Sequence, residues 1–275
     1  MKHSSAATFR SATASTSRST PGRPGRGWAS ERTGRIARII VDPKNADAVF
    51  ACALGHAYGP QPERGVYKTV DGGRYWNRVL FVDENTGCSD VAMDPNNPRV
   101  LFAGMWQLEI HTWGRTSGGP GSGLFKSIDG GATWKRLTGK GLPEPPLGKI
   151  SAQVARSNSS RVYALIETGD GMLTNDGQKT QSGSLWRSDD GGDTWELASA
   201  DRRLRGRTHY YTRFAVAPDN ENEAYFLAAE FTKTLDGRRH QHRSHGQGRT
   251  DRRQPRHVDR SGQWRSHGGR ARRRA

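Results

Sequence analysis

The stretch LFKSIDGGATW, residues 124–134, decides the fold of this chain because the sequence repeats it. Complete copies are VYKTVDGGRYW at 66–76 and LWRSDDGGDTW at 185–195, and a fourth copy begins as FTKTLDG at 231–237. The aspartates of the three complete copies lie 58 and 61 residues apart. Self-similarity at such a period is typical of repeat architectures, in which each unit is one small supersecondary structure.

A second element precedes each copy of the first. It is IIVDPKN at 39–45 and VAMDPNNP at 91–98, with weaker copies VARSN at 154–158 and VAPDN at 216–220. A β-rich run follows each one, at 48–51, 100–103, 162–165 and 224–227. Each unit therefore reads strand, Asp/Asn/Pro turn, strand, variable loop, strand, Asp-Gly-Gly turn and strand. This pattern predicts an all-β fold of β-propeller blades, each with four antiparallel strands: about three complete blades and part of a fourth.

Folding alone explains the residues of the Asp-Gly-Gly turns. Gly adopts positive φ without steric cost, and the Asp carboxylate accepts hydrogen bonds from turn amides. The preceding Ser or Thr hydroxyl adds another bond, and the Trp five positions after the Asp is expected to cover the turn and pack between blades. We therefore predict a structural role for Asp71, Gly73, Trp76, Asp129, Gly131, Trp134, Asp190, Gly192, Trp195 and Asp236.

The charge of the chain is concentrated at its two ends. The net charge is +16, of which residues 1–33 contribute +5 and residues 237–275 contribute +11, so residues 34–236 are neutral. A neutral body lacks the positive field that attracts a phosphate backbone, which argues against a specific nucleic-acid partner. We predict a disordered Ser/Arg-rich leader over 1–33, a propeller segment over 34–236 and a disordered Arg/His-rich tail over 237–275.

The chain has two cysteines, Cys52 and Cys88. Cys52 lies in an apolar run and is expected to be buried, while the sequence leaves a disulfide between the two open. Two single cysteines without paired histidines predict no zinc site, and we expect neither a metal nor a cofactor. No run has the ~18 apolar residues of a membrane span, and the N-terminus lacks the apolar stretch of a secretion signal.

The three complete copies resemble the Asp-box, also called the bacterial neuraminidase repeat (BNR). The sequence around these copies is similar to that of bacterial sortilin-like propeller proteins, which are often called glycosyl hydrolase BNR-repeat proteins. The similar segments are ALGH at 53–56, ERGVYK at 63–68, DENTG at 83–87, MWQ at 105–107 and SGGPGSG at 117–123. The resemblance covers about residues 30–237. It implies a propeller in a long secreted or periplasmic chain, without implying an activity.

The chain departs from that family in its number of blades. Family members carry more units, whereas here the fourth copy loses the pattern at Gly237-Arg238. The segment after that point has thirteen Arg and no Lys, as a GC-rich gene read out of frame would give. We therefore expect a truncated or frameshifted fragment. Because unclosed blades leave strand edges open to pairing with other chains, we also expect poor solubility.

Two insertions within the blades, Gly55–Gly65 and Met105–Gly123, carry the residues best suited to binding. Binding residues concentrate on loops displayed by a rigid scaffold, and aromatic and Arg side chains suit sugar rings or peptide partners. The candidate ligand-binding residues are His56, Tyr58, Arg64, Trp106, His111, Trp113 and Arg115. In a purely structural alternative, Trp106 and Trp113 pack the insertions onto their blade.

Two functions are compatible with these features. The first is a non-catalytic scaffold, or protein- or peptide-binding module, of the sortilin-like type. The second is a remnant of a propeller glycoside hydrolase acting on polysaccharide. The sequence gives neither the ligand nor the oligomeric state.

Neither kind of glycosidase chemistry has a recognisable motif. Glycoside hydrolysis needs two carboxylates facing one groove, and no pair stands out among Glu63, Asp83, Glu84, Asp90, Glu109 and Glu167. A sialidase needs converging arginines and a Tyr nucleophile, for which the candidates are Arg64, Arg115 and Arg213 with Tyr210 or Tyr211. We therefore predict no catalytic residues.

Overall fold

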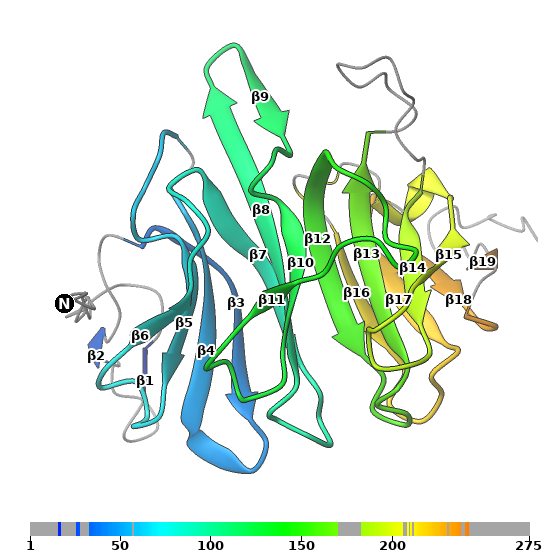
Figure 1. Ribbon diagram of the computed structural model, residues 1–275, viewed down its shortest axis with the longest axis horizontal. Helices are drawn as coiled ribbons and strands as arrows, with labels where there is room; N and C mark the ends of the chain where they lie inside the picture. The colour runs from blue at the N-terminus through cyan, green and yellow to red at the C-terminus, as the bar shows by residue number, and fades with distance from the viewer. Residues whose placement is uncertain are drawn as a thin grey trace, which may run out of the picture. The chain divides into compact units, whose positions relative to one another are not determined.

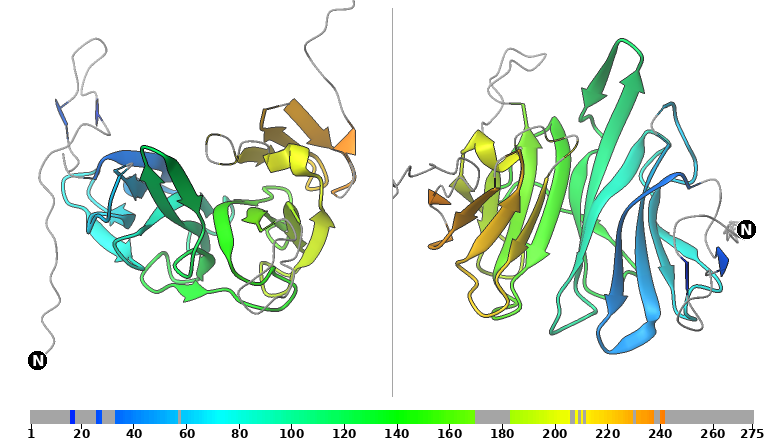
Figure 2. Two further views of the ribbon diagram at one scale, coloured as in Figure 1. Left: turned by 90° about the horizontal axis from the view of Figure 1, so that it is seen from above. Right: turned by 180° about the vertical axis from the view of Figure 1, so that it is seen from behind.

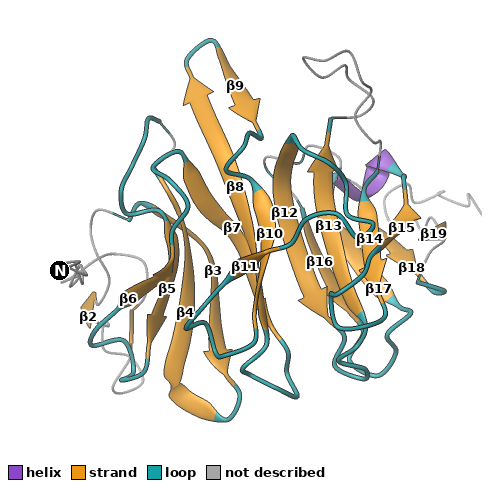
Figure 3. Cartoon of the chain, viewed as in Figure 1, coloured by secondary structure: helices purple, strands orange, loops and turns teal. Residues whose placement is uncertain are grey.

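The computed structural model describes residues 16–17, 26–27, 33–56, 58–169, 183–205, 208, 210, 212–229, 231–237 and 240–241. Within residues 35–241 the described strands form four antiparallel sheets in a β-propeller arrangement, which confirms the predicted fold class (Figure 1). Helix is limited, in this part of the chain, to one 3₁₀ turn at Arg202–Arg205 (Figure 3). None of the described residues belong to a helix with the length and apolar character of a membrane span.

Each repeat unit forms one sheet, here called a blade, whose strands are ordered as in the chain. Blade 1 contains β3 (Arg35–Asp42), β4 (Asn45–Gly55), β5 (Gly65–Thr69) and β6 (Asn77–Leu80). Blade 2 contains β7 (Thr86–Met93), β8 (Leu101–His111), β10 (Gly123–Ser127) and β11 (Lys135–Arg136), and β9 (Gly114–Ser117) pairs with the far end of β8. Blade 3 contains β12 (Leu147–Val154), β13 (Val162–Thr168), β14 (Leu185–Ser188) and β15 (Glu196–Ser199). Blade 4 contains β16 (Arg213–Val216), β17 (Ala224–Leu227), β18 (Phe231–Thr234) and β19 (His240–Gln241).

Three short strands extend beyond the predicted propeller segment. β1 (Thr16–Ser17) pairs with β2 (Arg26–Gly27) within the predicted leader. β19 pairs with β18 beyond residue 236, so blade 4 has four strands although its Asp-Gly-Gly copy is incomplete. Strands pair through their backbones and need no sequence motif, so β19 could not be predicted from a repeat that loses its pattern before it. The other residues of the predicted leader and tail lie outside the described residues.

Consecutive blades pack through apolar clusters. β7 contacts β3, β4 and β12, and β12 contacts β16, so the first strands of the blades follow one another in chain order (Figure 2). Phe50, Val91 and Phe125 belong to the cluster between blades 1 and 2. Phe102 and Trp186 belong to the cluster between blades 2 and 3. The equivalent cluster between blades 3 and 4 contains Tyr163, Leu165, Phe214 and Phe226.

The Asp-Gly-Gly turns share one hydrogen-bond pattern. In blade 2, Asp129 Oδ1 accepts a bond from the amide of Thr133 at 2.9 Å and one from Ser127 Oγ at 2.8 Å. Ser127 Oγ in turn accepts the amide of Gly131 at 2.9 Å. Equivalent bonds surround Asp71 and Asp190, and Thr234 Oγ1 lies 3.3 Å from Asp236 Oδ1. The hydroxyl of Thr133 also donates to Asp129, and this bond together with those from the Thr133 amide and Ser127 lowers the carboxyl pKa of Asp129 below its ordinary value.

The turns of blades 2 and 3 also pack on the preceding blade. A Cβ on Gly131 would lie 2.7 Å from Phe50 of blade 1, and one on Gly192 would lie 2.7 Å from Phe102 of blade 2. In both turns the glycine has positive φ. The indole Nε1 of Trp134 closes the turn by donating to the carbonyl of Gly131 at 3.2 Å, and Trp195 does the same to Gly192. Gly at these positions is therefore required by backbone conformation and by close packing together.

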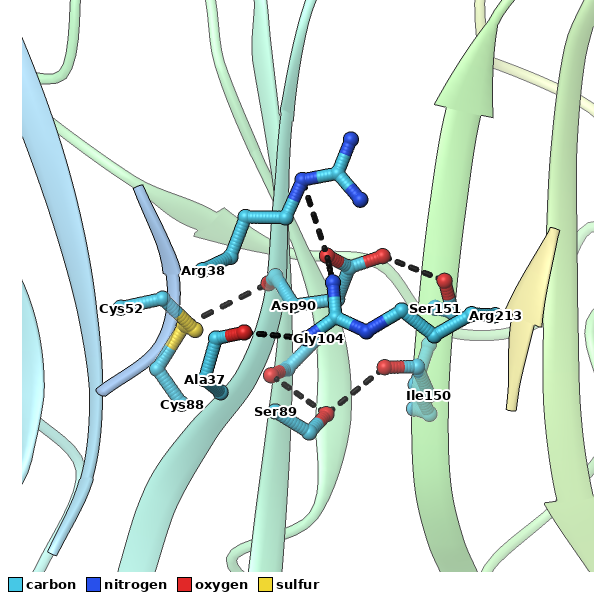
Figure 4. Close-up of a disulfide and its surroundings, with 10 residues drawn as sticks. All are labelled: Ala37, Arg38, Cys52, Cys88, Ser89, Asp90, Gly104, Ile150, Ser151 and Arg213. Atoms are coloured by element: carbon cyan, nitrogen blue, oxygen red, sulfur yellow. Dashed lines mark hydrogen bonds and ion pairs between the residues drawn. A yellow bond between two sulfur atoms is a disulfide. The ribbon is translucent and has the colours of Figure 1, made fainter. Parts of the chain in front are cut away.

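A disulfide joins blade 1 to blade 2. Cys52 of β4 and Cys88 of β7 are bonded, and both are fully buried (Figure 4). The expected burial of Cys52 is confirmed, and the disulfide left open by the sequence is present. Their separation of 36 residues made the pairing invisible to a local pattern.

Candidate functional site

The hairpin β8–β9 positions most of the predicted binding residues. β8 pairs with β10 over Leu101–Met105 and then with β9 over Leu108–His111, so its second half extends past the blade. In Figure 1 this green hairpin projects above the neighbouring strands. The tip carries His111 and Trp113. A long strand that changes partner therefore displays the insertion that carries most of the predicted binding residues.

An open cavity of about 560 Å³ lies against this hairpin. It brings together five of the seven predicted binding residues: Tyr58, Trp106, His111, Trp113 and Arg115. Its other lining residues are Arg35, Leu54, Leu108, Ile110, Thr112, Gly114 and Tyr210. Tyr210 is predicted from the sequence only as a candidate sialidase nucleophile, because it lies outside both repeat elements and both insertions.

The aromatic residues of the cavity differ in exposure. Trp113 is 84 % exposed, and Tyr58 and Tyr210 are also exposed. The ring of His111 stacks on Trp113 with centroids 4.8 Å apart and planes 6° from parallel. His111 Nε2 also lies 3.0 Å from a carboxylate oxygen of Glu109. The outer part of the cavity therefore offers a flat aromatic surface whose orientation is restrained by a second ring.

Trp106 forms a fixed part of the cavity wall. The residue is buried, and its indole Nε1 donates to Ser117 Oγ at 3.0 Å. Ser117 Oγ donates to Glu167 Oε2 at 2.6 Å, and the same oxygen accepts the amide of Lys149 at 2.9 Å. Lys149 Nζ lies 5.4 Å from the centroid of the Trp106 ring. This network connects the hairpin to blade 3 and holds the ring in one position.

Two predicted binding residues lie outside the cavity lining. Arg64 is buried, and its guanidinium donates to the main-chain carbonyls of Gly59 at 3.1 Å and His56 at 3.3 Å. It also donates to the carbonyl of Asn85 on the neighbouring loop. The geometry of Arg64 is that of a residue shaping the 55–65 insertion, and burial lowers the pKa of its guanidinium. The side chain of His56 is exposed, and its amide donates to Gln61 Oε1 at 2.6 Å.

The first strands of all four blades converge on one carboxylate, Asp90 (Figure 4). Asp90 on β7 accepts a hydrogen bond from Ser151 of β12. Its Oδ1 lies 3.7 Å from Arg38 Nε of β3 and 3.6 Å from Arg213 Nη1 of β16. At these distances the contacts are ion pairs rather than hydrogen bonds, and no described residue donates a hydrogen bond to Oδ1. Arg213 also donates to the carbonyl of Ala37.

Burial dominates the ionisation of this centre. It raises the pKa of the Asp90 carboxyl above its ordinary value, although Arg38, Ser151 and Arg213 all favour the ionised form. Burial also lowers the pKa of Lys149 to about 8, with repulsion by Arg213 acting in the same direction. Glu167 and Asp90 counteract part of the shift on Lys149. The side chains of Asp90 and Lys149 therefore resist carrying charge, each for the same physical reason.

The carboxylates and arginines considered for catalysis are held apart by separate contacts. Among the described residues that line the cavity, none is Asp or Glu. Asp83 accepts the amide of Asn85 at 2.8 Å in a turn, and Glu109 contacts His111. Arg64 and Arg213 bind main-chain carbonyls on different loops and strands, while Arg115 lines the cavity. Tyr211 lies outside the described residues.

A second cavity of about 610 Å³ lies at the Asp-Gly-Gly turns of blades 2 and 3. Lys126, Lys135 and Lys140 line it, together with Trp134 and Trp195. Lys126 Nζ is already paired with Asp193 at 2.9 Å, and the two tryptophans close their own turns. Lys126 and the two tryptophans are thus engaged in contacts of the turns themselves, and we favour the hairpin cavity as the functional site. No group of three or more His, Cys, Asp or Glu is arranged for a metal in the described part of the chain.

Sequence comparison relates the chain to polysaccharide-degrading enzymes. It is 25% identical over 187 residues to a xyloglucanase from a Paenibacillus species, covering 62% of this chain and 17% of that enzyme. It is 27% identical over 186 residues to a xyloglucanase from Hypocrea jecorina, covering 63% and 19%. The chain therefore spans less than a fifth of the length of these relatives. No family model matches it.

Structural comparison shows propeller proteins. The GH74 xyloglucanase from Xanthomonas campestris superposes with a TM-score of 0.50 and 16% identity, covering 76% of this chain and 28% of the enzyme. YCF48 bound to D1 peptide gives a TM-score of 0.42 and 13% identity, covering 78% and 55%. Such similarity concerns the fold alone.

Proposed function

We propose that this chain is a glycoside hydrolase-like propeller module that binds a polysaccharide in the hairpin cavity. The observation that carries the proposal is the pair formed by Trp113 and His111, a stacked and solvent-facing aromatic surface beside the fixed ring of Trp106. The xyloglucanases among the relatives suggest a xyloglucan-like β-glucan as the ligand.

The chemistry of the lining suits a sugar chain. One face of a pyranose ring presents C–H groups, which pack on an exposed aromatic ring such as that of Trp113, while the hydroxyls at its edge need polar partners. Arg115 and His111 supply such groups at the cavity rim, and Tyr58 and Tyr210 each combine a ring with a hydroxyl. A site lined mainly by aromatic and apolar side chains, with a few polar groups, is typical of small-molecule recognition.

The cavity supports binding without cleavage. Both classes of glycosidase place two carboxylic groups on either side of the scissile bond. The described residues that line the cavity provide none. Asp90 is buried where the first strands of the four blades meet, and Glu167 is bound to Ser117 and the Lys149 amide, so neither forms such a pair there. Hydrolysis by the module is therefore not part of the proposal.

A peptide is the second candidate ligand. The Asp-Gly-Gly turns resemble the Asp-box, and the similarity of the surrounding sequence to sortilin-like proteins favours a protein- or peptide-binding scaffold. The same aromatic and Arg side chains suit a peptide. The Cys52–Cys88 disulfide also supports an oxidising compartment, as expected for proteins of that kind.

Affinity electrophoresis in gels containing soluble xyloglucan tests the proposal. We expect the wild-type chain to be retarded and Trp113→Ala to migrate as in a gel without polysaccharide. Tyr75→Ala is the matched control, because Tyr75 is an exposed aromatic residue outside the cavity lining, and it should be retarded like the wild type. Equal retardation of all three proteins, or none, would refute the proposal.

A further inference from the structure

Each blade presents the same four positions to the blade that follows it. Two cross-strand pairs supply these positions. In the first pair an aromatic residue lies opposite a Lys or Arg, and the second pair, which lies two residues further along the strands, is mostly apolar. The sets are Phe50, Lys68, Cys52 and Val66 in blade 1; Phe102, Lys126, Gly104 and Leu124 in blade 2; Tyr163, Arg187, Leu165 and Leu185 in blade 3; and Tyr225, Lys233, Leu227 and Phe231 in blade 4. We call each set the seat of its blade.

The seats of blades 1 to 3 are occupied by the next Asp-Gly-Gly turn. Gly131 approaches Phe50, Gly192 approaches Phe102, and Gly237 approaches the hydroxyl of Tyr163. The seat cation completes the contact: Lys68 Nζ, 5.4 Å from the Phe50 ring centroid, donates to the carbonyl of Gly130 at 2.7 Å. The aromatic and apolar members of these three seats are buried.

The seat of blade 4 has the same construction but is exposed. Lys233 Nζ lies 5.8 Å from the centroid of the Tyr225 ring, as in the occupied seats. Leu227 is 55 % exposed and Phe231 is 41 % exposed, whereas their equivalents in the other blades are buried. Glu223 pairs with Lys233 at 3.5 Å. Blade 4 thus carries a formed seat without a turn from the described residues upon it.

Blade 1 carries the surface that complements the exposed seat of blade 4. The three atoms nearest to a Cβ on Gly73 all belong to its own Trp76, whereas Gly131 and Gly192 meet the preceding blade. On β3, Ile39 is 41 % exposed and Val41 is 52 % exposed. Ile39 pairs with Ala51 as Val91 pairs with Ala103, and Val91 is buried by blade 1.

We propose that blade 4 of one copy of this chain docks on blade 1 of a second copy, with the Asp71–Trp76 turn in the seat of blade 4. The contact repeats the joint that the chain forms three times internally. Tyr225 lies under Gly73, Lys233 donates to the carbonyl of Gly72, and Leu227 packs near Ile39. Glu223, beside Lys233, meets Arg74 of the turn. Such a contact uses two different surfaces, so it is heterologous.

The chain's own C-terminal segment is a poor occupant of this seat. Residues 242–275 contain only two large apolar side chains, those of Val258 and Trp264. The same residues include eleven Arg and twelve small residues of the types Gly, Ala, Ser, Thr and Pro. A segment of this composition offers little apolar area to cover Leu227 and Phe231. Blade 1 of a second copy offers both an apolar strand and the turn that the seat fits.

Sedimentation velocity of the full chain over a range of concentrations tests the proposal through two variants. Leu227→Glu places a charge in the seat, and Ile39→Glu places one on the face of blade 1. We expect the wild type to associate as its concentration rises and each variant to remain monomeric. An equimolar mixture of the two variants should form a species of two copies and none larger, because one intact seat meets one intact turn.

Controls separate the joint from general effects of the substitutions. Ile128→Glu, at an exposed position on the turn of blade 2, should associate like the wild type. Tyr225→Ala adds a second change within the seat, and thermal melts must show that all variants fold. Three results would overturn the proposal: a wild type that stays monomeric, an Ile39→Glu variant that still self-associates, or a mixture that fails to form the two-copy species.

Discussion

Arg213 Nη1 of β16 lies 3.6 Å from Asp90 Oδ1 of β7, so a charge contact links the fourth blade directly to the second. The two residues are far apart in the sequence, and no repeat element contains both. Arg38 of blade 1 and Ser151 of blade 3 contact the same carboxylate. One buried acid thus joins the first strands of all four blades, and its protonation is coupled to their packing.

Asp90 should make the protein less stable as pH rises from the acidic range. Burial raises its pKa in the folded state, so between the ordinary Asp pKa of about 4 and the raised value the folded chain holds more protons than the unfolded chain. Stability therefore falls across this window. The side chain of an Asp90→Asn variant stays neutral, so the variant should lack this fall in stability. The difference between the urea midpoints of wild type and variant should therefore change with pH across the window. A pH-independent difference would contradict the assignment.

The Asp-Gly-Gly carboxylates should act in the opposite direction. Hydrogen bonds lower the pKa of Asp129 in the folded state, so its contribution to stability is present above the ordinary Asp pKa and is lost as pH falls through and below that value. We expect Asp129→Ala to reduce the urea midpoint at neutral pH and to have a smaller effect in acid. The control is Glu144→Ala at an exposed loop position, which should leave the midpoint unchanged at both pH values.

Lys149 should add a third contribution to the pH dependence of stability, in the alkaline range. Its pKa of about 8 in the folded state lies below the ordinary lysine value of 10.5, so the unfolded chain binds more protons between these values. Stability should rise with pH across this interval, because a buried charge is removed. Lys149→Met should show no such rise in urea titrations. If wild type and variant follow parallel curves, Lys149 is not the titrating group.

Gly131→Ala should weaken the joint between blades 1 and 2. The added methyl group would meet Phe50 at 2.7 Å, and the φ of +81° disfavours any side chain. Backbone strain of this kind costs about 1–3 kcal/mol before the clash is counted. Gly191→Ala is the matched control, since its φ is +74° but no atom lies within 4 Å of the added group. Chemical denaturation should find Gly131→Ala the more destabilised, and equal losses would show that packing on Phe50 contributes nothing.

Reduction of the Cys52–Cys88 bond should lower the free energy of unfolding by about 2–4 kcal/mol, the usual effect of a cross-link on the unfolded chain. The measurement is a pair of urea titrations with and without reductant. A Cys52→Ser/Cys88→Ser double variant should already show the loss and respond no further to reductant. A reductant effect on that variant would place its cause elsewhere.

Repetition made the sheets predictable from the sequence, because each Asp-Gly-Gly copy specifies its turn through contacts within five residues. Contacts between distant residues were not predictable in the same way. Arg213 and the carbonyl of Ala37 are 176 residues apart, and Cys52 and Cys88 sit in different units. Neither pairing leaves a local signal, because it depends on how blades pack.

The candidate site was predictable to the extent that it lies on an insertion. Trp113 and His111 stand out as aromatic residues in a segment that the repeat does not require, and the cavity contains both. Arg64 stands in a similar insertion, yet its guanidinium binds main-chain carbonyls of its own loop. Residue type alone does not separate a binding arginine from one that shapes the loop. Tyr210 comes from the segment before β16, outside the repeat elements, so only the fold brings it to the cavity.

Tryptophan fluorescence during titration with soluble xyloglucan tests the central claim most directly. Trp113 is the most exposed of the described tryptophans, so a sugar chain that covers it should shift the emission to shorter wavelength and saturate. Trp113→Ala should show no saturable shift, while Tyr75→Ala should behave as the wild type. A wild-type spectrum that does not respond to xyloglucan, or an unchanged response in Trp113→Ala, would contradict the account.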